Sequence, residues 1–302
     1  MTRASQNTTQ RYPGATPAQW LEGARPHTWA NAFAPVLAGT AAAIAAGHGD
    51  VSRAVLAGIV AWALIIGVNY ANDYSDGIRG TDDDRVGPLR LTGSGLVPPA
   101  MVKRAAFIAF GVAGVAGVIL SLASSWWLIL IGAACIAGAW FYTGGDNPYG
   151  YRGLGEVAVF VFFGLVAVLG TEFTQAGAMS WRGLAMAIAV GAMSSAVNLA
   201  NNLRDIPSDR EAGKITLAVK LGDRGTRMLW VGLVAVAIAL TLFIAAGHVT
   251  FLIALVAVPL MVVAAMPVVK GAQGGDLIPV LGMLGRGMLL WSVAALVAAF
   301  LN

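Results

Sequence analysis

The sequence predicts an all-α integral membrane protein. Hydrophobic residues make up 58% of its 302 residues and charged residues only 11%, whereas about 25% of the residues of a soluble domain are charged. The mean hydropathy is +0.74. The apolar residues form long continuous runs without alternation, and in lipid only helices and closed barrels satisfy their backbone hydrogen bonds. These runs are therefore interpreted as transmembrane helices.

Nine runs are long enough to cross a bilayer, which takes roughly 17–25 mostly apolar residues. They are rich in Ala, Leu, Val and Gly, and the 38 glycines of the chain suit close packing of membrane helices. The nine predicted spans are 28–47, 54–72, 104–122, 125–142, 154–172, 181–201, 228–246, 250–269 and 278–300.

The remainder of the chain is polar. Residues 1–27 have no early apolar run of the signal-peptide type and are predicted to be a cytoplasmic N-terminal arm. Residues 28–302 are predicted to form a single membrane domain, which carries two acidic loops at 72–103 and 201–227.

Lys and Arg are distributed unevenly between the two sides of the predicted bundle. The side of the N-terminus and of the loops after even-numbered spans carries 16 of the 19, and the other side carries only Arg53 and Arg182. The positive-inside rule makes the first side cytoplasmic. We therefore expect a multi-pass protein of the cytoplasmic membrane, with cytoplasmic acidic loops and the C-terminus outside.

The acidic loops share a spacing. Asn72 and Asp76 are four residues apart where the second span ends, and Asn201, Asp205 and Asp209 follow the same spacing where the sixth span ends. Residues four apart lie on one face of an α-helix. We therefore expect two similar polar helix extensions, related as an internal repeat. The loops hold nine of the 15 acidic residues, namely Asp73, Asp76, Asp82, Asp83, Asp84, Asp205, Asp209, Glu211 and Asp223.

Acidic side chains stacked one turn apart repel one another, so a cation is expected among them. Carboxylate and amide oxygens suit Mg²⁺, which is usually held by one or two carboxylates plus substrate phosphates. Basic residues among the acids favour a metal-bridged polyanion such as diphosphate. The alternative is a pair of ordinary hydrophilic loops. The basic residues are Arg79, Arg85, Arg90, Arg204, Arg210, Lys214 and Lys220.

These motifs resemble those of the UbiA superfamily of intramembrane prenyltransferases. NDYSD at 72–76 is similar to its first aspartate motif, and NLRDIPSD at 202–209, with Asn201, to its second. The stretches NDYSDGIRGTDDDRVGPLRLTGSG, YTGGDNPYGYRGLGE and NNLRDIPSDREAGKITLAVKLG, with RPHTW at 25–29, resemble the 1,4-dihydroxy-2-naphthoate prenyltransferases of the MenA type. The resemblance covers nearly the whole chain and implies a UbiA-like helical bundle with a cytoplasmic polar cap.

One position departs from the general superfamily pattern. The last aspartate of the first motif is expected at position 80, which is Gly80, and the acidic group is delayed to Asp82, Asp83 and Asp84. The MenA type resembles this delayed form. Which of the three contacts metal is left open, and Asp82 is favoured.

The resemblance implies an Mg²⁺-dependent aromatic prenyltransferase. Its substrates would be a polyprenyl diphosphate, reached through the lipid bilayer, and 1,4-dihydroxy-2-naphthoate, which loses CO₂ to give demethylmenaquinone in menaquinone biosynthesis. No nucleic-acid partner is expected. The implied catalytic residues are Asp73, Asp76, Asp205 and Asp209. The implied metal ligands are Asn72, Asp76, Asp82, Asn201, Asp205 and Asp209. The implied substrate-binding residues are Arg25, Asn72, Arg79, Arg85, Tyr142, Asn201, Lys214 and Arg286.

Several of these roles have a plain structural alternative. Asp73 is either a ligand or a capping residue that points away. Tyr142, with Tyr149 and Tyr151 after it, either contacts substrate or belongs to an interfacial aromatic belt. Arg286, inside the last span, either faces a cavity and an anionic substrate or snorkels to the interface.

The remaining basic and acidic positions are interpreted in the same way. Arg25 binds the naphthoate carboxylate or a phosphate, or only sets topology. Arg79, Arg85 and Lys214 hold the diphosphate or form a solvated positive loop. Glu172, near the outer end of span five, is expected to be exposed.

Two other functions remain as alternatives. The first is another prenyltransferase of the superfamily that acts on 4-hydroxybenzoate, homogentisate or protohaem. The second is a cation-coupled transporter, a class that places acidic residues at mid-membrane in broken helices. The clustering of carboxylates at one face, with bases among them, favours a capped active site.

Overall fold

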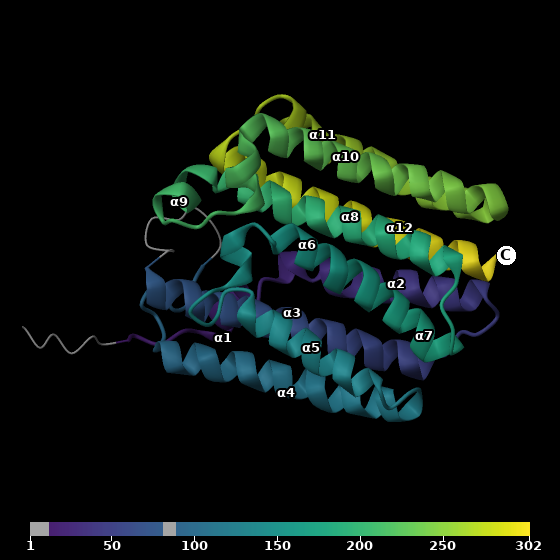
Figure 1. The fold of residues 1–302 in the computed structure, drawn as a ribbon, viewed down its shortest axis with the longest axis horizontal. Coiled ribbons are helices and arrows are strands. Elements are labelled where there is room, and N and C mark those ends of the chain that lie inside the picture. Colours follow the sequence, from purple (N-terminus) through teal and green to yellow (C-terminus); the bar gives the residue numbers. More distant parts are fainter. Residues whose placement is uncertain (1–11, 81–88) are drawn as a thin grey trace, which may run out of the picture.

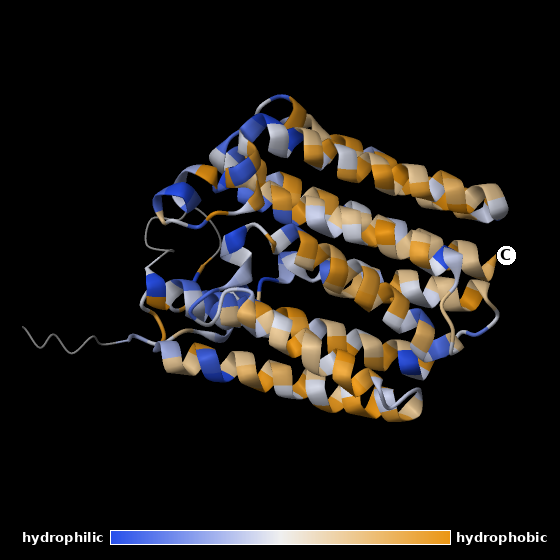
Figure 2. Ribbon diagram, viewed as in Figure 1, coloured by the Kyte–Doolittle hydropathy of each residue, from blue (hydrophilic) through white to orange (hydrophobic). Residues whose placement is uncertain are grey.

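The computed structural model describes residues 12–80 and 89–302, and the regular secondary structure of this part is entirely helical. Long helices lie side by side with their axes roughly aligned (Figure 1). Hydrophobic residues cover most of their length, and hydrophilic residues gather toward the end that carries α1 and α9 (Figure 2). The predicted all-α class is confirmed.

Local sequence signals set several helix ends in the first half. Thr16 and Gln19 form a capping box at the start of α1, and the Asp50 side chain caps α3. Gly80 ends α3 with a φ of 72°, a conformation open to glycine. The elements are α1 (Pro17–Gly23), η1 (Pro26–Thr28), α2 (Ala30–Ala45), α3 (Val51–Arg79), α4 (Pro99–Ala123), α5 (Leu128–Phe141), η2 (Tyr149–Arg152), α6 (Gly155–Val159), the π-helical η3 (Phe160–Leu169) and α7 (Gly170–Ala176).

The second half begins with a long buried helix. Ser180 caps α8 and Thr216 caps α10. Helix α10 is kinked at Gly222, whose φ of 69° is left-handed. The elements are α8 (Trp181–Arg204), α9 (Ile206–Glu211), α10 (Leu217–Gly247), η4 (Val249–Ala257), α11 (Val258–Val269), η5 (Gly274–Leu277) and α12 (Ile278–Phe300).

Every predicted span coincides with a helical segment, but the count of nine is not confirmed. Seven helical segments of the described residues are long and apolar enough to cross a membrane, and an eighth is a pair bent by 47°, Pro17–Thr28 with Ala30–Ala45. The bend lies before α2, where Arg25 and Pro26 form a turn, and the predicted span 28–47 shortens to the 16 residues of α2. The predicted span 125–142 shortens to the 14 residues of α5.

Helix α8 lies at the centre of the molecule. Its side chains are buried along most of its length, and its neighbours are α2, η3, α10 and α12. Met186, Met193 and Leu199 from this helix share one large apolar core with Trp230 and Trp291.

Small residues allow the closest approach between helices. A Cβ atom on Gly164 of η3 would lie 2.6 Å from the Cα of Gly191 on α8. The backbones therefore meet at this crossing, as the glycine-rich composition predicts.

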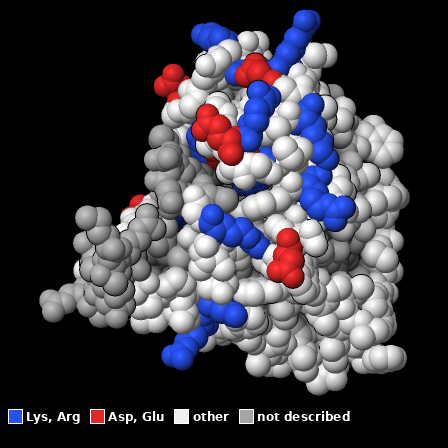
Figure 3. Space-filling model, turned by 60° about the vertical axis from the view of Figure 1, so that its left-hand side comes forward, with Lys and Arg blue, Asp and Glu red and all other residues white. Residues whose placement is uncertain are grey.

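The connections alternate between the two ends of the bundle. Gly80 and residues 89–98, 142–154, 205–216 and 270–277 lie at one end with α1, and we call this the polar end. The shorter connections lie at the opposite end, where the chain also finishes (Figure 1). Lys and Arg side chains are spread over the polar end, with fewer acidic ones (Figure 3). The arrangement agrees with a polar cap on one side of a membrane.

The expectation that Glu172 is exposed is wrong. Glu172 is only 1% exposed. Its Oε1 accepts hydrogen bonds from Ser180 N at 3.0 Å and Ser180 Oγ at 2.6 Å. The carboxylate is enclosed because α7 ends beneath the N-terminus of α8. Its Oε2 is buried and accepts no hydrogen bond from the described residues.

Candidate active site

A cavity of about 1060 Å³ extends from the polar end into the bundle. Its polar part includes Asn72, Arg90, Asn201 and Arg204, and its apolar part is formed mainly by α3, α4, α5 and η3. The far part reaches Thr174 of α7, near the opposite end. The cavity is therefore elongated, with polar groups at its mouth and hydrocarbon along its walls.

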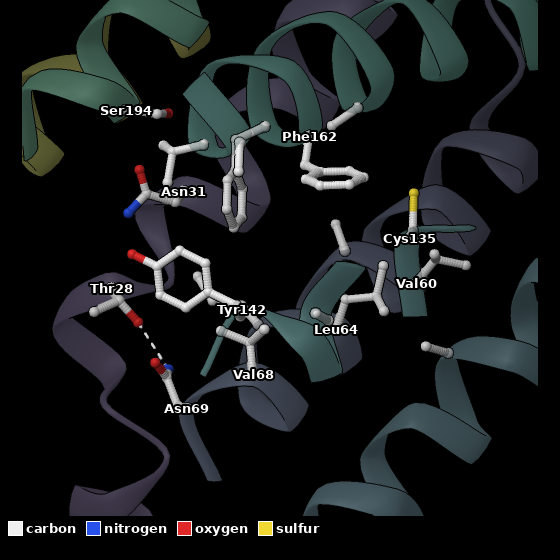
Figure 4. A pocket seen from close by; sticks show the side chains of 18 of the residues that line it. Thr28, Asn31, Val60, Leu64, Val68, Asn69, Cys135, Tyr142, Phe162 and Ser194 are labelled. Atoms are coloured by element: carbon white, nitrogen blue, oxygen red, sulfur yellow. Dashed lines mark hydrogen bonds between the residues drawn. The ribbon is translucent and has the colours of Figure 1, made fainter. Parts of the chain in front are cut away.

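Tyr142 projects into the cavity at the boundary between these parts (Figure 4). On one side of its ring lie Thr28, Asn31 and Asn69. Asn69 Nδ2 donates hydrogen bonds to Thr28 Oγ1 and Ala24 O, both at 3.0 Å. Asn31 Oδ1 is buried and accepts no hydrogen bond from the described residues. This wall therefore combines the Asn69 amide, held by two hydrogen bonds, with the Asn31 oxygen, which can accept a hydrogen bond from an aromatic ligand.

Asn72 and Asp76 lie on one continuous helix, as the spacing predicts, because α3 extends to Arg79. Asn72 lines the cavity, and its Oδ1 accepts a hydrogen bond from Thr143 Oγ1 at 2.8 Å. Asp76 Oδ1 accepts one from the Tyr151 hydroxyl at 2.6 Å, and Arg90 Nη2 lies 3.6 Å from Asp76 Oδ2. Asp76 is only 5% exposed, so these partners compensate a buried charge.

The carboxylate of Asp73 points to the connection that follows α3. Its oxygens accept hydrogen bonds from the backbone N–H groups of Leu91, at 2.7 Å, and Thr92, at 3.0 Å. Asp73 is 1% exposed and does not line the cavity. In this arrangement it has the capping geometry, one of the two alternatives for this residue.

Arg79 also binds a connection. Its guanidinium donates to the carbonyl oxygens of Thr143 and Gly145 and lies 5.6 Å from the centre of the Tyr151 ring. The connection from 142 to 154 is thereby attached to the end of α3.

The second motif is divided between two helices. Helix α8 ends at Arg204, and α9 begins at Ile206 with Pro207 in its first turn. The expectation that Asn201, Asp205 and Asp209 share one unbroken helix face is therefore wrong. The single hydrogen bond from Asp209 N to Asp205 O, at 2.8 Å, still keeps the two acids one turn apart.

Each acid of the second motif is paired with a base. Arg204 binds both carboxylate oxygens of Asp205, at 2.6 and 2.7 Å, and its Nη2 also donates to Asn201 Oδ1 at 2.9 Å. Lys214 Nζ lies 3.4 Å from Asp209 Oδ1. Asp205 and Asp209 are 6% and 7% exposed, so the paired bases compensate two buried charges.

The residues expected to bind substrate are only partly brought together. Arg25, Asn72, Tyr142, Asn201 and Arg286 line the cavity. The carboxylates, together with Arg79 and Lys214, lie behind this lining. Asp82 and Arg85 fall outside the described residues, as do Asp83 and Asp84.

Two arginines of the lining have unusual positions. Arg25 is the one non-glycine residue of the described chain with a positive φ, 53°, in the turn between α1 and η1. Arg286 reaches the cavity from the third turn of α12 and has no hydrogen bond or ion pair with the described residues. An intramembrane Arg that faces a cavity is a functional candidate.

Sequence reasoning overlooked Glu156. This residue of α6 is 5% exposed, and its Oε1 accepts hydrogen bonds from Asn202 Nδ2 at 2.6 Å and Asn198 Nδ2 at 3.3 Å. Its Oε2 is buried and has no hydrogen-bond partner in the part of the chain that the structure describes. The available signal was an acid at the start of the apolar run GLGEVAVFVFF.

Tyr149 has a structural partner. Its hydroxyl donates to Gly138 O at 2.7 Å. Burial raises the pKa of Tyr149 to about 12, so the phenol stays protonated and keeps this bond at neutral pH.

The donor chemistry of the two motifs fits a hard divalent cation. Asn72, Asp76, Asn201, Asp205 and Asp209 offer only carboxylate and amide oxygens, which Mg²⁺ prefers. Among the described residues, no three acidic, His or Cys side chains are grouped closely enough to hold a metal by themselves. Such a donor set suits an ion that is completed by phosphate oxygens from a ligand.

Comparison with known proteins identifies the family of this chain. A model of the UbiA prenyltransferase family matches residues 32–293. A curated relative from Mycobacterium tuberculosis, 1,4-dihydroxy-2-naphthoate octaprenyltransferase, is 58% identical over 277 residues, which are 92% of this chain and 95% of the relative.

Solved structures show the same fold. A UbiA homolog from Aeropyrum pernix superposes with a TM-score of 0.70 at 15% identity and covers 90% of this chain and 97% of its own. A homolog from Archaeoglobus fulgidus, bound to DMAPP and Mg²⁺, gives 0.64 at 14% identity and covers 92% and 99%. The helical bundle, the paired Asn/Asp motifs and the family match together establish that this chain belongs to the UbiA prenyltransferase family.

Proposed function

We propose that this protein transfers a polyprenyl group from polyprenyl diphosphate to 1,4-dihydroxy-2-naphthoate, with release of diphosphate and CO₂, as a step of menaquinone biosynthesis. The observation that carries the proposal is the elongated cavity, apolar along its walls and lined at its mouth by Asn72 and Asn201, the asparagines that begin the two Asn/Asp motifs. The name of the 58% identical relative supports the naphthoate acceptor.

Mg²⁺ is the proposed cofactor, held by Asn72, Asp76, Asn201, Asp205 and Asp209, with Asp82 as a further ligand. When bound, the metal neutralises charge on the diphosphate leaving group. The Archaeoglobus relative was solved with DMAPP and Mg²⁺, which supports Mg²⁺ as the ion.

The bases beside the carboxylates then have a second use. Arg90, Arg204 and Lys214 now neutralise Asp76, Asp205 and Asp209. Once the carboxylates hold a metal, these cations are available for diphosphate oxygens, where charge develops as the bond breaks. Arg79 and Arg85 would add to the same positive field, and Asp73 would hold the connection that carries Arg90.

The proposed reaction balances without an external acid. The allylic carbon–oxygen bond breaks, and its electron pair leaves with the diphosphate. A ring carbon of the naphthoate attacks the allylic cation. The carboxyl group on that carbon leaves as CO₂, and its electron pair restores the aromatic ring. The apolar walls of the cavity protect the cation from water.

The acceptor is proposed to bind beside Tyr142. Arg25 and Arg286 line the same cavity and supply positive charge for the naphthoate carboxylate. The Tyr142 ring offers a face for the naphthalene rings. The isoprenoid tail is proposed to occupy the apolar part between α3, α5 and η3.

We further propose that residues 28–302 act as one membrane domain in the cytoplasmic membrane, with the polar end in the cytoplasm and the C-terminus outside. The excess of Lys and Arg at the polar end supports this orientation. Prenyl diphosphate would then enter from the bilayer and the polar acceptor from the cytoplasm.

The test is a reconstituted assay with Mg²⁺, a polyprenyl diphosphate and 1,4-dihydroxy-2-naphthoate, analysed by mass spectrometry. The expected product has the mass of the prenylated naphthoquinol after loss of CO₂. Turnover with only 4-hydroxybenzoate, homogentisate or haem would contradict the acceptor assignment. No consumption of prenyl diphosphate with any acceptor would contradict prenyl transfer and favour a transporter.

A further inference from the structure

The connection between α5 and α6 is hydrogen-bonded to the first Asn/Asp motif and to the segment that follows the second. Tyr151, in η2, donates its hydroxyl proton to Asp76 Oδ1 of the first motif at 2.6 Å. Its backbone oxygen accepts a hydrogen bond from Ile215 N, after the second motif, at 3.0 Å. Tyr151 therefore contacts one residue 75 positions before it and another 64 positions after it in the chain.

Two cations also lie near the ring of Tyr151, one from the end of α3 and one from the segment after α9. The Arg79 guanidinium lies 5.6 Å from the ring centre and the Lys214 ammonium 5.3 Å. Both distances are within the range of cation–π attraction. Lys214 is in turn the partner of Asp209, at 3.4 Å. A continuous set of contacts thus runs from Asp76 through Tyr151 and Lys214 to Asp209.

Neighbouring bonds hold this connection in place. Lys220 Nζ donates to Arg152 O at 2.6 Å. A Cβ atom on Gly153 would lie 2.7 Å from Lys220 Nζ, so the backbone approaches this lysine closely. The position of Tyr151 is consequently determined by α10 as well as by α3.

The hydroxyl bond fixes the orientation of one carboxylate. A phenol that donates to an ionised carboxylate forms a short, charge-assisted bond. With Oδ1 bonded to Tyr151, Oδ2 of Asp76 is the oxygen that lies toward Arg90, at 3.6 Å. Arg90 lines the cavity.

We infer that Tyr151 is a positioning residue that sets Asp76 of the first motif in register with Lys214 and Asp209 of the second. Its hydroxyl presents the Asp76 carboxylate to the metal–diphosphate, and its ring keeps Lys214 beside Asp209. The inference rests on the proposed function for the identity of this ligand. A residue that only anchored a loop would stabilise the fold equally with and without ligand.

Two variants separate the hydroxyl from the ring. Tyr151→Phe removes the hydrogen bond to Asp76 and retains the ring for Lys214, whereas Tyr151→Leu removes both. The matched control is Tyr70→Phe. Tyr70 is on α3, as Asp76 is, and its hydroxyl donates to Trp20 O at 2.8 Å, but Tyr70 does not line the cavity.

The measurement is thermal unfolding of the full-length protein in detergent during an Mg²⁺ titration, with geranyl thiolodiphosphate as a non-reactive ligand. For Tyr151→Phe we expect the Mg²⁺ concentration at half-maximal stabilisation to rise about tenfold, the loss typical of one hydrogen bond to a charged group. Tyr151→Leu should also weaken the affinity for the analogue. Tyr70→Phe should lower the unfolding temperature equally at all Mg²⁺ concentrations.

An Mg²⁺ dependence of Tyr151→Phe that stays within twofold of wild type would overturn the inference, as would tighter Mg²⁺ binding by this variant. If Tyr151→Leu does not fold, Tyr151→Phe still decides the outcome. This readout needs no turnover. Failure of the wild-type naphthoate assay therefore refutes the proposed function alone, whereas normal Mg²⁺ binding by Tyr151→Phe refutes the inference alone.

Discussion

Arg204 and Asp205 are consecutive in the chain, yet their side chains form a two-point ion pair, with Nε–Oδ1 at 2.6 Å and Nη2–Oδ2 at 2.7 Å. The side chains are 4% and 7% exposed. A buried pair of this kind is costly to break, because removal of one partner leaves the other charge without compensation. The pair therefore fixes the orientation of the Asp205 carboxylate behind Arg204, which lines the cavity.

Loss of charge at either motif should abolish activity. Asp76→Asn and Asp205→Asn retain the size of the side chain but remove the negative charge needed for a metal. We expect kcat/KM for prenyl diphosphate to fall by about 10²–10³-fold or more, as when one preorganised charge-stabilising group is removed. Asp223→Asn is the control, because that carboxylate is 54% exposed and paired with Arg227. Near-normal rates in folded Asp76→Asn or Asp205→Asn protein would contradict the metal assignment.

Removal of divalent metal should stop the reaction reversibly. The carboxylates and amides of the two motifs suit Mg²⁺, so EDTA is expected to reduce turnover to background and excess Mg²⁺ to restore it. The rate of diphosphate release measures both steps. Turnover that continues in EDTA after dialysis would argue against a metal-assisted leaving group.

Arg286 should affect the acceptor more than the donor. Its guanidinium lines the cavity and has no ion pair with the described residues. Arg286→Leu is expected to raise KM for the naphthoate by roughly 10-fold or more, the loss of a charge-assisted hydrogen bond, with little change in KM for prenyl diphosphate. Steady-state kinetics with each substrate varied in turn distinguish the two. An unchanged KM for the naphthoate would indicate that the Arg286 side chain only extends toward the membrane interface.

The single cysteine gives a direct probe of the tail site. Cys135 lies on the α5 wall of the cavity, beside Ile131 and Ile136. N-ethylmaleimide should modify it slowly in the free protein, and a long-chain prenyl diphosphate with Mg²⁺ should protect it. Intact-mass spectrometry measures the extent of modification, and Cys135→Ala supplies the background. Equal labelling with and without the lipid substrate would place the tail elsewhere.

Gly183 should be intolerant of any side chain. A Cβ atom there would lie 1.8 Å from Glu172 Oε2. Gly183→Ala is expected to cost about 1–3 kcal/mol, the usual range for overpacking. Gly111→Ala on α4 is the control, since its Cβ would meet nothing within 4 Å and alanine favours the helix. Thermal unfolding in detergent compares the two, and an equal effect would show that Glu172 moves freely.

The long helices could be predicted from the sequence because lipid leaves a chain few choices. An apolar run of 20 residues must satisfy its own backbone, so α3, α4 and α10 follow from composition alone. The break before α2 and the shortness of α5 were less evident, because Arg25–Pro26 and Ser125–Trp127 lie within or beside runs of high mean hydropathy.

The site was predictable where it depends on local spacing. Asn72 and Asp76 share a helix face because nothing interrupts α3. Pro207 interrupts the second motif, and this signal was present in the sequence but given no weight. Contacts such as Tyr151 with Asp76, or Glu156 with Asn202, join residues 75 and 46 positions apart, and they depend on how helices pack. The burial of Glu172 likewise depends on where α7 meets α8.

The cavity has one wall that is shorter than the membrane. Helix α5 has 14 residues, none of them buried, and lines the cavity on one side. At 1.5 Å per residue it is about 21 Å long, whereas the hydrocarbon core of a bilayer is about 30 Å thick. A hydrophobic helix shorter than the bilayer is accommodated by local thinning of the bilayer or by its flanking residues. We therefore expect the bilayer to be thinner beside α5 than around the longer helices, at a face where α5 contributes to the cavity wall.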